Sequence, residues 1–252
     1  MRSPSTLPAV LLHGTAATHA VWLPVQRRLP QVRVLAPDRP GHGGNPRPPT
    51  DVAGNVAWLL RLLDRAGIHR TVLGCHGWAA GVGILAAARH PDRVAGLALV
   101  APVGPHCVEP LDRLLTAPVL GEMLAWGGQR LAGGWLARRA RQDLRAHLDP
   151  ADLPAVLAEL AAHARRPVWR TFLVEQRALV RQRALLEGAT VRVTVPVLIL
   201  AGTEDSAVPA RTIESLATAL PDPAVSWLEH TPHEVPLHAP EPVAAAIEQL
   251  TG

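Results

Sequence analysis

The stretch LGCHGWAAG, Leu73 to Gly81, decides how this chain folds. It connects an apolar run that begins at Thr71 to an alanine-rich segment with helical spacing that ends near Pro91. Apart from His76 and Trp78, the residues at the junction are small, as a tightly packed turn requires. The stretch therefore predicts a buried strand, a sharp turn and a helix that packs back against the strand.

Runs of the same two kinds alternate over most of the chain. Short apolar runs predict strands at 7–12, 32–37, 71–75, 94–102, 195–202 and 224–229. Apolar residues at helical spacing predict helices at 20–29, 51–67, 78–91, 210–220 and 241–250. Because strands that alternate with helices imply right-handed crossovers, we expect an α/β fold. Its sheet should be doubly wound and mostly parallel, with about six strands.

The alternation stops between residues 104 and 194. This segment is rich in Arg, Ala and Leu, and its pattern is helical. We expect it to form a helical cap, or lid, inserted into a core made of residues 1–103 and 195–252. Breaks between its helices are expected at the glycine pairs 127–128 and 133–134 and at four prolines, namely Pro118, Pro150, Pro154 and Pro167.

The composition excludes several other classes of protein. The chain has 252 residues and is 48% hydrophobic, which is enough for a large core. No apolar run reaches the roughly 18 residues of a membrane-spanning helix, so we expect no membrane partner. The formal net charge is +4, and the arginines that carry it are scattered among acidic residues, so we expect no nucleic-acid partner.

The sequence also contains no pattern that binds a metal or a cofactor. Two cysteines are too few for a disulfide framework, and no metal-ligand spacing, phosphate loop or dinucleotide fingerprint is present. We therefore expect neither a metal nor a cofactor. The N-terminal apolar run is too short for a secretory signal, so we expect a cytoplasmic protein, as a monomer or a homodimer.

Four stretches together resemble the α/β-hydrolase family. They are LLHG (11–14), APDRPGHGGN (36–45), the LGCHGWAAG stretch, and the pair LILAGTEDSAVP and LEHTPHEVPLHAPE near the C-terminus. They occur in the family's order and cover nearly the whole chain outside the expected cap. The resemblance implies the α/β-hydrolase fold with an inserted helical cap.

Members of this family carry a nucleophile, usually serine, at a strand-to-helix turn flanked by small residues. This chain has no serine there. Placing Gly77 at the nucleophile position puts His76 and Trp78 beside it, which resembles the family's frequent His-Ser-Trp. If His76 held the nucleophile position, Trp78 would stand where the turn needs a small residue. If Cys75 held it, Leu73 would stand at such a position. Gly77 is the preferred register, and Cys75 is the alternative that supplies a nucleophile.

The resemblance also implies the remaining catalytic groups. Asp205 stands at the position of the family's acid, and His233 stands at the position of its histidine. The backbone N–H groups of Thr15 and Trp78 correspond to the oxyanion hole. That of Thr15 lies in the turn after the first strand, and that of Trp78 lies at the start of the helix that follows Gly77.

Neighbouring residues in the two C-terminal loops are alternatives for these roles. Glu204 is an alternative acid, although it is one residue from the family position. His230 and His238 are alternative bases, although His230 belongs to a strand end and His238 points into the last helix. From position alone, we expect the substrate pocket to be lined by Gly14, His76, His106, Trp126, Trp135 and Trp169.

A histidine held by an aspartate is a general base, and backbone N–H groups that face it stabilise an oxyanion. Without a serine, such a site still abstracts a proton beside a carbonyl or activates a water. We therefore expect a cofactor-independent enzyme acting on a carbonyl-containing small molecule as a lyase, isomerase, epimerase, cyclase or water-attack hydrolase, in natural-product biosynthesis. Two alternatives stay open: a serine hydrolase of esters, amides or thioesters whose serine is replaced by Gly77, and a non-catalytic ligand-binding protein.

Overall fold

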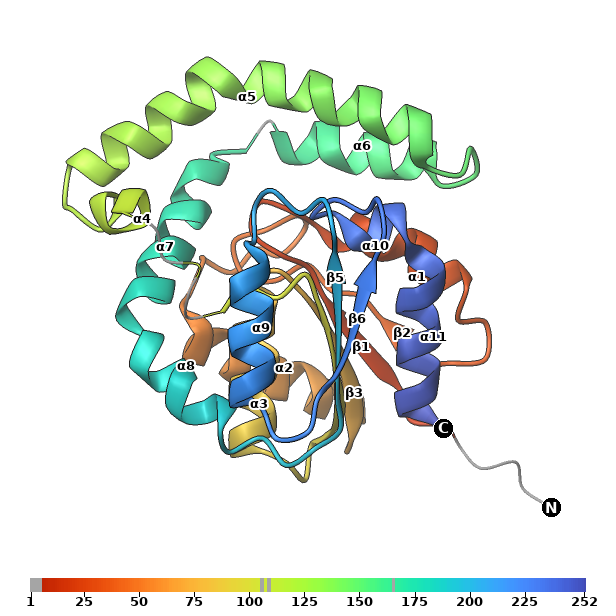
Figure 1. Ribbon diagram of the computed structural model, residues 1–252. Helices are drawn as coiled ribbons and strands as arrows, with labels where there is room; N and C mark the ends of the chain where they lie inside the picture. The colour runs from red at the N-terminus through yellow and green to blue at the C-terminus, as the bar shows by residue number, and fades with distance from the viewer. Residues whose placement is uncertain (1–5, 105–106, 108–109, 165) are drawn as a thin grey trace.

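In the part of the chain that the structure describes, six parallel strands form one sheet (Figure 1). The computed structural model describes residues 6–104, 107, 110–164 and 166–252. The strand order is β2-β1-β3-β4-β5-β6, which confirms the α/β fold and the doubly wound sheet predicted from the sequence. The strands are β1 (Ala9–Leu12), β2 (Val34–Leu35), β3 (Thr71–His76), β4 (Val94–Val100), β5 (Val197–Gly202) and β6 (Ala224–Leu228).

Helices cover both faces of this sheet (Figure 1). One face carries η1 (His19–Trp22), α1 (Leu23–Arg27), α10 (Val235–His238) and α11 (Pro240–Thr251). The other carries α2 (Val52–Arg65), α3 (Ala79–Arg89), α8 (Arg183–Thr190) and α9 (Ala210–Ala219). A buried apolar cluster lies on each side, which explains why the central strands read as nearly unbroken apolar runs.

Most predicted strands and helices differ from the structure by one or two residues at an end, and for two of them the difference has a clear physical cause. The expected strand 32–37 is reduced to β2. This strand lies at the edge of the sheet and pairs only with β1, and Pro37, the last residue of the expected strand, has no N–H to donate. The expected helix 20–29 divides into η1 and α1, with Pro24 in the first turn of α1, where its missing N–H costs nothing.

Five described helices lie in residues 104–194, between β4 and β5, which we call the cap segment. They are α4 (Pro110–Leu115), α5 (Leu120–His147), α6 (Leu153–Ala164), α7 (Val168–Arg181) and α8. Figure 1 shows α5 and α6 above the end of the sheet to which β5 and β6 point, and α7 descending beside it. The last helix, α8, packs against α3 and completes the layer on that face of the sheet.

The breaks predicted within the cap segment are correct at the prolines and wrong at the glycines. Pro118 and Pro150 lie between helices, Pro154 lies in the first turn of α6 and Pro167 caps α7, but α5 continues through both glycine pairs. Proline removes a hydrogen bond and clashes with the preceding turn, whereas glycine only lowers helix propensity. Among the described residues, none of the helices, α5 included, is both long and apolar enough to cross a membrane.

The strand order places a topological switch point between β1 and β3. The chain leaves β1 toward β2 on one side and returns to β3 on the other, so helices depart in opposite directions at this point. Ligands of doubly wound sheets bind outside the carboxyl ends of the strands at such a switch point. Leu12 pairs with Cys75 near the ends of the two strands, so the residues that follow them are neighbours.

Candidate active site

Gly77 occupies a sharp turn between β3 and α3. Its φ is +54°, a left-handed conformation that strains any residue with a Cβ. Its N–H donates to the Val100 carbonyl at 2.9 Å, and its carbonyl accepts from the Val103 N–H at 3.1 Å. A Cβ at position 77 would lie 3.4 Å from Nε2 of His233 and 3.8 Å from Cα of Gly14. A side chain at this position would therefore face His233 and the turn that follows β1.

Cys75, the alternative nucleophile, lies inside β3 rather than at the turn. It is fully buried, and its Sγ packs against α3, where a Cβ added to Gly83 would lie 2.7 Å from the sulfur. Burial is the main cause that raises the pKa of the Cys75 thiol to about 12, so the thiol stays protonated. This geometry favours Gly77 over Cys75 as the residue at the nucleophile position.

His233 and Asp205 form a hydrogen-bonded pair from the loops that follow β6 and β5. Nδ1 of His233 donates to Oδ2 of Asp205 at 2.8 Å. The other oxygen, Oδ1, accepts from the backbone N–H groups of Ala207 and Val208, both at 2.8 Å. Because Nδ1 carries the proton, Nε2 of His233 is left as the basic nitrogen toward Gly77.

A close crossing of the two loops brings this pair together. A Cβ added to Gly202, at the end of β5, would lie 2.0 Å from the carbonyl oxygen of Thr231. Only glycine allows the loop that carries His233 to pass so near the loop that carries Asp205.

Burial and hydrogen bonding have opposite effects on the pKa of each partner. Burial disfavours a charged His233, but the hydrogen bond to Asp205 and the charges of Glu234 and Asp205 outweigh it and raise the His233 pKa. Burial also disfavours a charged Asp205, but hydrogen bonds from His233 and from two backbone N–H groups outweigh it and lower the Asp205 pKa. The pair is thus a carboxylate and an imidazole of increased basicity, which suits a general base.

The alternative acid and bases make contacts elsewhere. Glu204 and His230 pair with each other at 3.0 Å, with side chains that are 60% and 89% exposed. The expectation that His238 points into the last helix is wrong, because its Nε2 lies 3.0 Å from Oδ2 of Asp143 on α5. The structure brings Asp205 and His233 together and gives these other residues different partners.

Thr15 and Trp78 lie at the two turns that flank the switch point. Trp78 is the N-terminal cap of α3, and N–H groups at the start of a helix have no intrahelical acceptor. An oxyanion beside Gly77 would also meet the positive end of the α3 dipole. Thr15 directly follows Gly14, whose Cα lies 3.8 Å from the position of a Cβ on Gly77. Thr15 and Trp78 are thus the chain neighbours of Gly14 and Gly77, two residues that lie close together.

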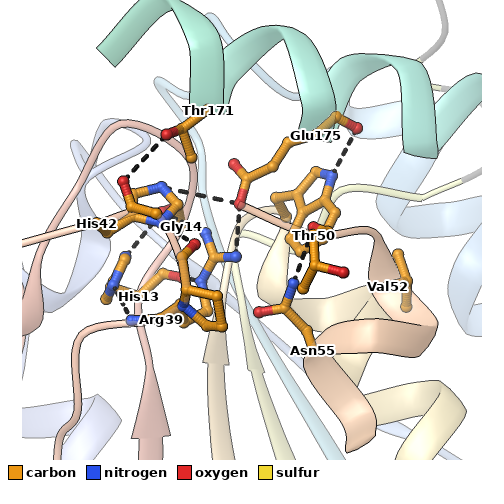
Figure 2. Close-up of polar contacts among 12 residues, drawn as sticks. His13, Gly14, Arg39, His42, Thr50, Val52, Asn55, Thr171 and Glu175 are labelled. Atoms are coloured by element: carbon orange, nitrogen blue, oxygen red, sulfur yellow. Dashed lines mark hydrogen bonds and ion pairs between the residues drawn. The ribbon is translucent and has the colours of Figure 1, made fainter. Parts of the chain in front are cut away.

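A buried ion pair that the sequence analysis did not single out lies behind these two turns (Figure 2). Nη1 of Arg39 lies 2.5 Å from Oε1 of Glu175 on α7, and the two side chains are 0% and 1% exposed. The same guanidinium donates to the carbonyl of His13 at 2.7 Å and to the carbonyl of Gly14 at 2.9 Å. Arg39 therefore fixes the turn that leads into Thr15.

The same pair also contacts Trp78. The Arg39 guanidinium carbon lies 4.8 Å from the centre of the Trp78 ring, and the indole N–H donates to the Glu175 carbonyl at 3.1 Å. Arg39 lies in the stretch 36–45 that resembles a family turn, and this local pattern could have marked it as a site residue. Glu175 lies 136 positions from it, inside a helix whose pattern gives no such signal.

His76 and Gly14 lie beside His233 rather than in an open pocket. Nε2 of His76 donates to the His233 carbonyl at 3.0 Å, and the two rings are 5.0 Å apart. Burial is the main cause that lowers the pKa of His76, so the ring is neutral. A Cβ on Gly14 would lie 3.2 Å from Nδ1 of His76, so the two turns are tightly packed. His76 thereby supports the loop that carries the candidate base.

A cavity of about 740 Å³ lies within the cap segment and reaches Ala16, one residue beyond Thr15. Trp169 lines it. Trp126 lines a neighbouring hollow and is 54% exposed, and Trp135 is 55% exposed and lines neither of these two hollows among the described residues. His106 lies outside the described residues.

One group of described side chains could hold a metal ion, although the sequence spacing gave no sign of it. Ligand atoms of Asp143, His147 and His238 all lie within 4.8 Å of one another. His147 follows Asp143 by one helical turn, but His238 is brought in from the far end of the chain by α10. This group joins the cap segment to the core and shares no residue with the His233–Asp205 pair.

The fold and the paired loops define the class of this protein. A model of the alpha/beta hydrolase family matches residues 9–246, and the chain belongs to this family. Among curated relatives, a pimeloyl-[acyl-carrier protein] methyl ester esterase of Aromatoleum aromaticum is 32% identical, with 96% of each chain covered. Lipase LipV of Mycobacterium tuberculosis is 30% identical over 60% of this chain, and the match spans only 55% of the lipase.

Solved structures show the same fold. Cfl2 of Burkholderia cenocepacia superimposes with a TM-score of 0.77 at 23% identity, covering 99% of this chain and 90% of that one. A thermophilic esterase of Thermogutta terrifontis gives a TM-score of 0.74 at 20% identity, covering 99% and 92%. The haloalkane dehalogenase DbeA of Bradyrhizobium elkani gives 0.74 at 19% identity, covering 98% and 90%. At these identities the similarity is one of fold.

Proposed function

We propose that this protein is a cofactor-independent enzyme in which His233, held by Asp205, acts as a general base on a carbonyl-containing small molecule. Gly77 stands at the family's nucleophile position, so no covalent enzyme intermediate forms there. The N–H groups of Thr15 and Trp78 stabilise the oxyanion, and the cap segment, residues 104–194, covers the substrate.

One observation carries this proposal. Nε2 of His233 lies 3.4 Å from the point where a Cβ on Gly77 would stand, while its Nδ1 is held by Asp205 at 2.8 Å. The base is thus aimed at the place where a family nucleophile would be, and glycine leaves that place free for a water molecule or a substrate carbon. The turn that would strain a larger residue is retained, with glycine relieving the strain.

Hydrolysis through water needs no further group. A water beside Gly77 gives a proton to Nε2 of His233 as its oxygen bonds to the carbonyl carbon. The oxyanion that forms accepts hydrogen bonds from the N–H groups of Thr15 and Trp78. When this intermediate collapses, the bond to the leaving group breaks and the proton on Nε2 passes to that group. An acid and an alcohol, amine or thiol leave, and His233 is neutral again.

The names of the curated relatives favour hydrolysis, since they include an esterase and a lipase. The same geometry supports a second reaction class. His233 can remove a proton from the carbon beside the carbonyl while the two N–H groups hold the enolate oxygen. Isomerisation, epimerisation, cyclisation or elimination would follow from that enolate. The missing nucleophile removes acyl-enzyme chemistry but leaves both the base and the oxyanion donors in place.

The test compares the unmodified protein with His233→Ala and with His230→Ala as a matched control on the surface. Each is incubated with aryl esters, thioesters and lactones, and separately with ketones in D₂O to detect exchange at the α-carbon. We expect turnover or exchange that falls about 100-fold or more in His233→Ala and is unchanged in His230→Ala. Undiminished turnover or exchange in His233→Ala would contradict the proposal.

Intact-mass measurement separates direct water attack from acyl transfer. The unmodified protein should carry no covalent adduct during ester turnover or after treatment with a fluorophosphonate. An acyl adduct on any residue during turnover would show that a nucleophile operates, and would refute the role given to Gly77.

A further inference from the structure

Five glycines lie within helix α5, although glycine is a poor helix former. The backbone does not require them, because the described glycines with a left-handed φ are Gly41, Gly43, Gly67 and Gly77, none of which is in α5. Each of the five therefore needs another explanation. They are Gly121, Gly127, Gly128, Gly133 and Gly134.

Packing within the protein explains Gly121 and none of the other four. A Cβ at Gly121 would lie 2.2 Å from the Leu115 carbonyl oxygen, so only glycine fits. A Cβ at Gly128 would meet no atom of the described residues within 4 Å. At Gly133 the nearest atom would be Cγ of Gln129 at 3.7 Å, and at Gly134 it would be Nη1 of Arg138 at 4.0 Å. These three positions have room for side chains that the protein does not place there.

The space beside these three glycines belongs to the cavity of about 740 Å³. Gly128, Gly133 and Gly134 line it from α5, and Trp169 and Phe172 line it from α7. Bare helix backbone on one wall and aromatic rings on another suit a broad, flat apolar group better than a thin chain.

His163 is the buried polar residue in the cavity lining. It is 6% exposed, and neither of its ring nitrogens makes a hydrogen bond of standard geometry to a described residue, although the Ala16 backbone lies near enough to oppose the effect of burial on its pKa. Its ring stacks on His42 at 6.1 Å, and burial is the main cause that lowers the pKa of both imidazoles, that of His42 to about 2. Buried polar groups in proteins are normally paired, so His163 indicates a partner that comes with a ligand. A neutral imidazole suits an uncharged hydroxyl or carbonyl.

We infer that the cavity binds a ring-containing apolar part of the substrate between the α5 glycines and the aromatic residues of α7, with His163 meeting one uncharged polar group. This inference rests on the proposed function, because the cavity reaches Ala16, beside the oxyanion donor Thr15. A carbonyl held at that donor would extend its apolar part into the cap segment.

The experiment measures binding rather than turnover. The probes are 2-acetonaphthone, an uncharged aromatic ketone, and decanoate, a linear carboxylate that the half-buried Arg141 in the lining would favour. Dissociation constants are measured by calorimetry for the unmodified protein, Gly133→Leu, Gly127→Leu and His163→Phe. Gly127 is the matched control, because a Cβ there would meet no described atom within 4 Å, so a side chain fits as it does at Gly133, but Gly127 does not line the cavity.

We expect the ketone to bind more tightly than decanoate, and Gly133→Leu to weaken its binding about tenfold or more. Gly127→Leu should change the binding less than twofold, and His163→Phe should weaken it about threefold or more. Both leucine variants should raise the unfolding midpoint by roughly 3 °C, because leucine is the better helix former. The raised midpoint would show that a leucine variant that fails to bind is still folded.

Three results would overturn the inference. They are equal binding by the two leucine variants, tighter binding of decanoate than of the ketone, and a large loss of stability in Gly133→Leu, which would show that the glycine serves packing. His233→Ala separates this inference from the proposed function. Its turnover tests the base, whereas binding of the ketone by the unmodified protein, Gly133→Leu and Gly127→Leu is measured without catalysis, so the two proposals can fail independently.

Discussion

The buried ion pair between Arg39 and Glu175 predicts an unusually large effect for a conservative substitution. Glu175→Gln keeps the shape of the side chain and removes its charge, which leaves the Arg39 guanidinium buried without a counter-charge. Removing one partner of a buried pair typically costs about 3–5 kcal/mol. Because glutamine keeps an acceptor oxygen for Arg39, we expect the lower end, about 3 kcal/mol in the free energy of unfolding.

A matched control is available in the next helix of the cap segment. Glu187 pairs with Arg183 at 2.8 Å, but these side chains are 45% and 44% exposed, and an exposed pair contributes at most about 1 kcal/mol. In a protein of this size, 1 kcal/mol shifts the unfolding midpoint by roughly 3 °C. Glu175→Gln should therefore lower the midpoint by roughly 10 °C, and Glu187→Gln by no more than a few degrees.

The assay is thermal and urea unfolding followed by circular dichroism. A third variant, Arg39→Met combined with Glu175→Leu, should recover most of the stability, because apolar residues of similar volume need no counter-charge. It should nevertheless show reduced turnover, since the carbonyls of His13 and Gly14 lose the donor that fixes the oxyanion turn. If Glu175→Gln and Glu187→Gln unfold at the same temperature, the reasoning is refuted.

Three further predictions follow from the candidate site. Gly77→Ala should lower the free energy of unfolding by about 1 kcal/mol in urea titrations, because its φ of +54° strains a residue with a Cβ; an increase in stability would contradict the turn geometry. His233 acts as a base only when neutral, and its raised pKa places the acidic limb of the kcat/KM profile above 6.5. In Asp205→Asn, burial should prevail and move that limb to lower pH, while the plateau falls by roughly 1,000-fold or more. Cys75 should resist iodoacetamide in the native protein at pH 8 and react only after unfolding in urea, as mass spectrometry would show.

The sequence predicts those features that depend on short stretches of chain. Strand-end loops are short, so the resemblance to the family's two C-terminal loops points to Asp205, three residues after Gly202, and to His233 in the HTPHEVP stretch. In the structure, Nδ1 of His233 lies 2.8 Å from Oδ2 of Asp205, and the catalytic roles of the two residues stay a prediction. The alternating pattern was equally sufficient for the parallel sheet, because strands buried on both faces read as apolar runs.

Features that depend on distant residues could not be read in this way. Glu175 reaches Arg39 across 136 positions, and helical periodicity does not distinguish a buried glutamate from an exposed one. The glycine pairs 127–128 and 133–134 predict breaks because sequence rules score only local propensity. A continuous α5 is compatible with them because glycine still makes the backbone hydrogen bonds of an α-helix. The cavity beside them depends on residues of α6 and α7, which lie far away in the sequence.

The most direct test of the central claim is fluorophosphonate labelling of Gly77→Ser, with Gly77→Ala as the control. If His233 and Asp205 are aimed at position 77, the serine variant should gain one phosphonyl group by intact mass and the alanine variant none. Combining Gly77→Ser with His233→Ala should abolish the label, because the base that activates the hydroxyl is gone. A folded Gly77→Ser protein that remains unlabelled would contradict the claim that this base faces the nucleophile position.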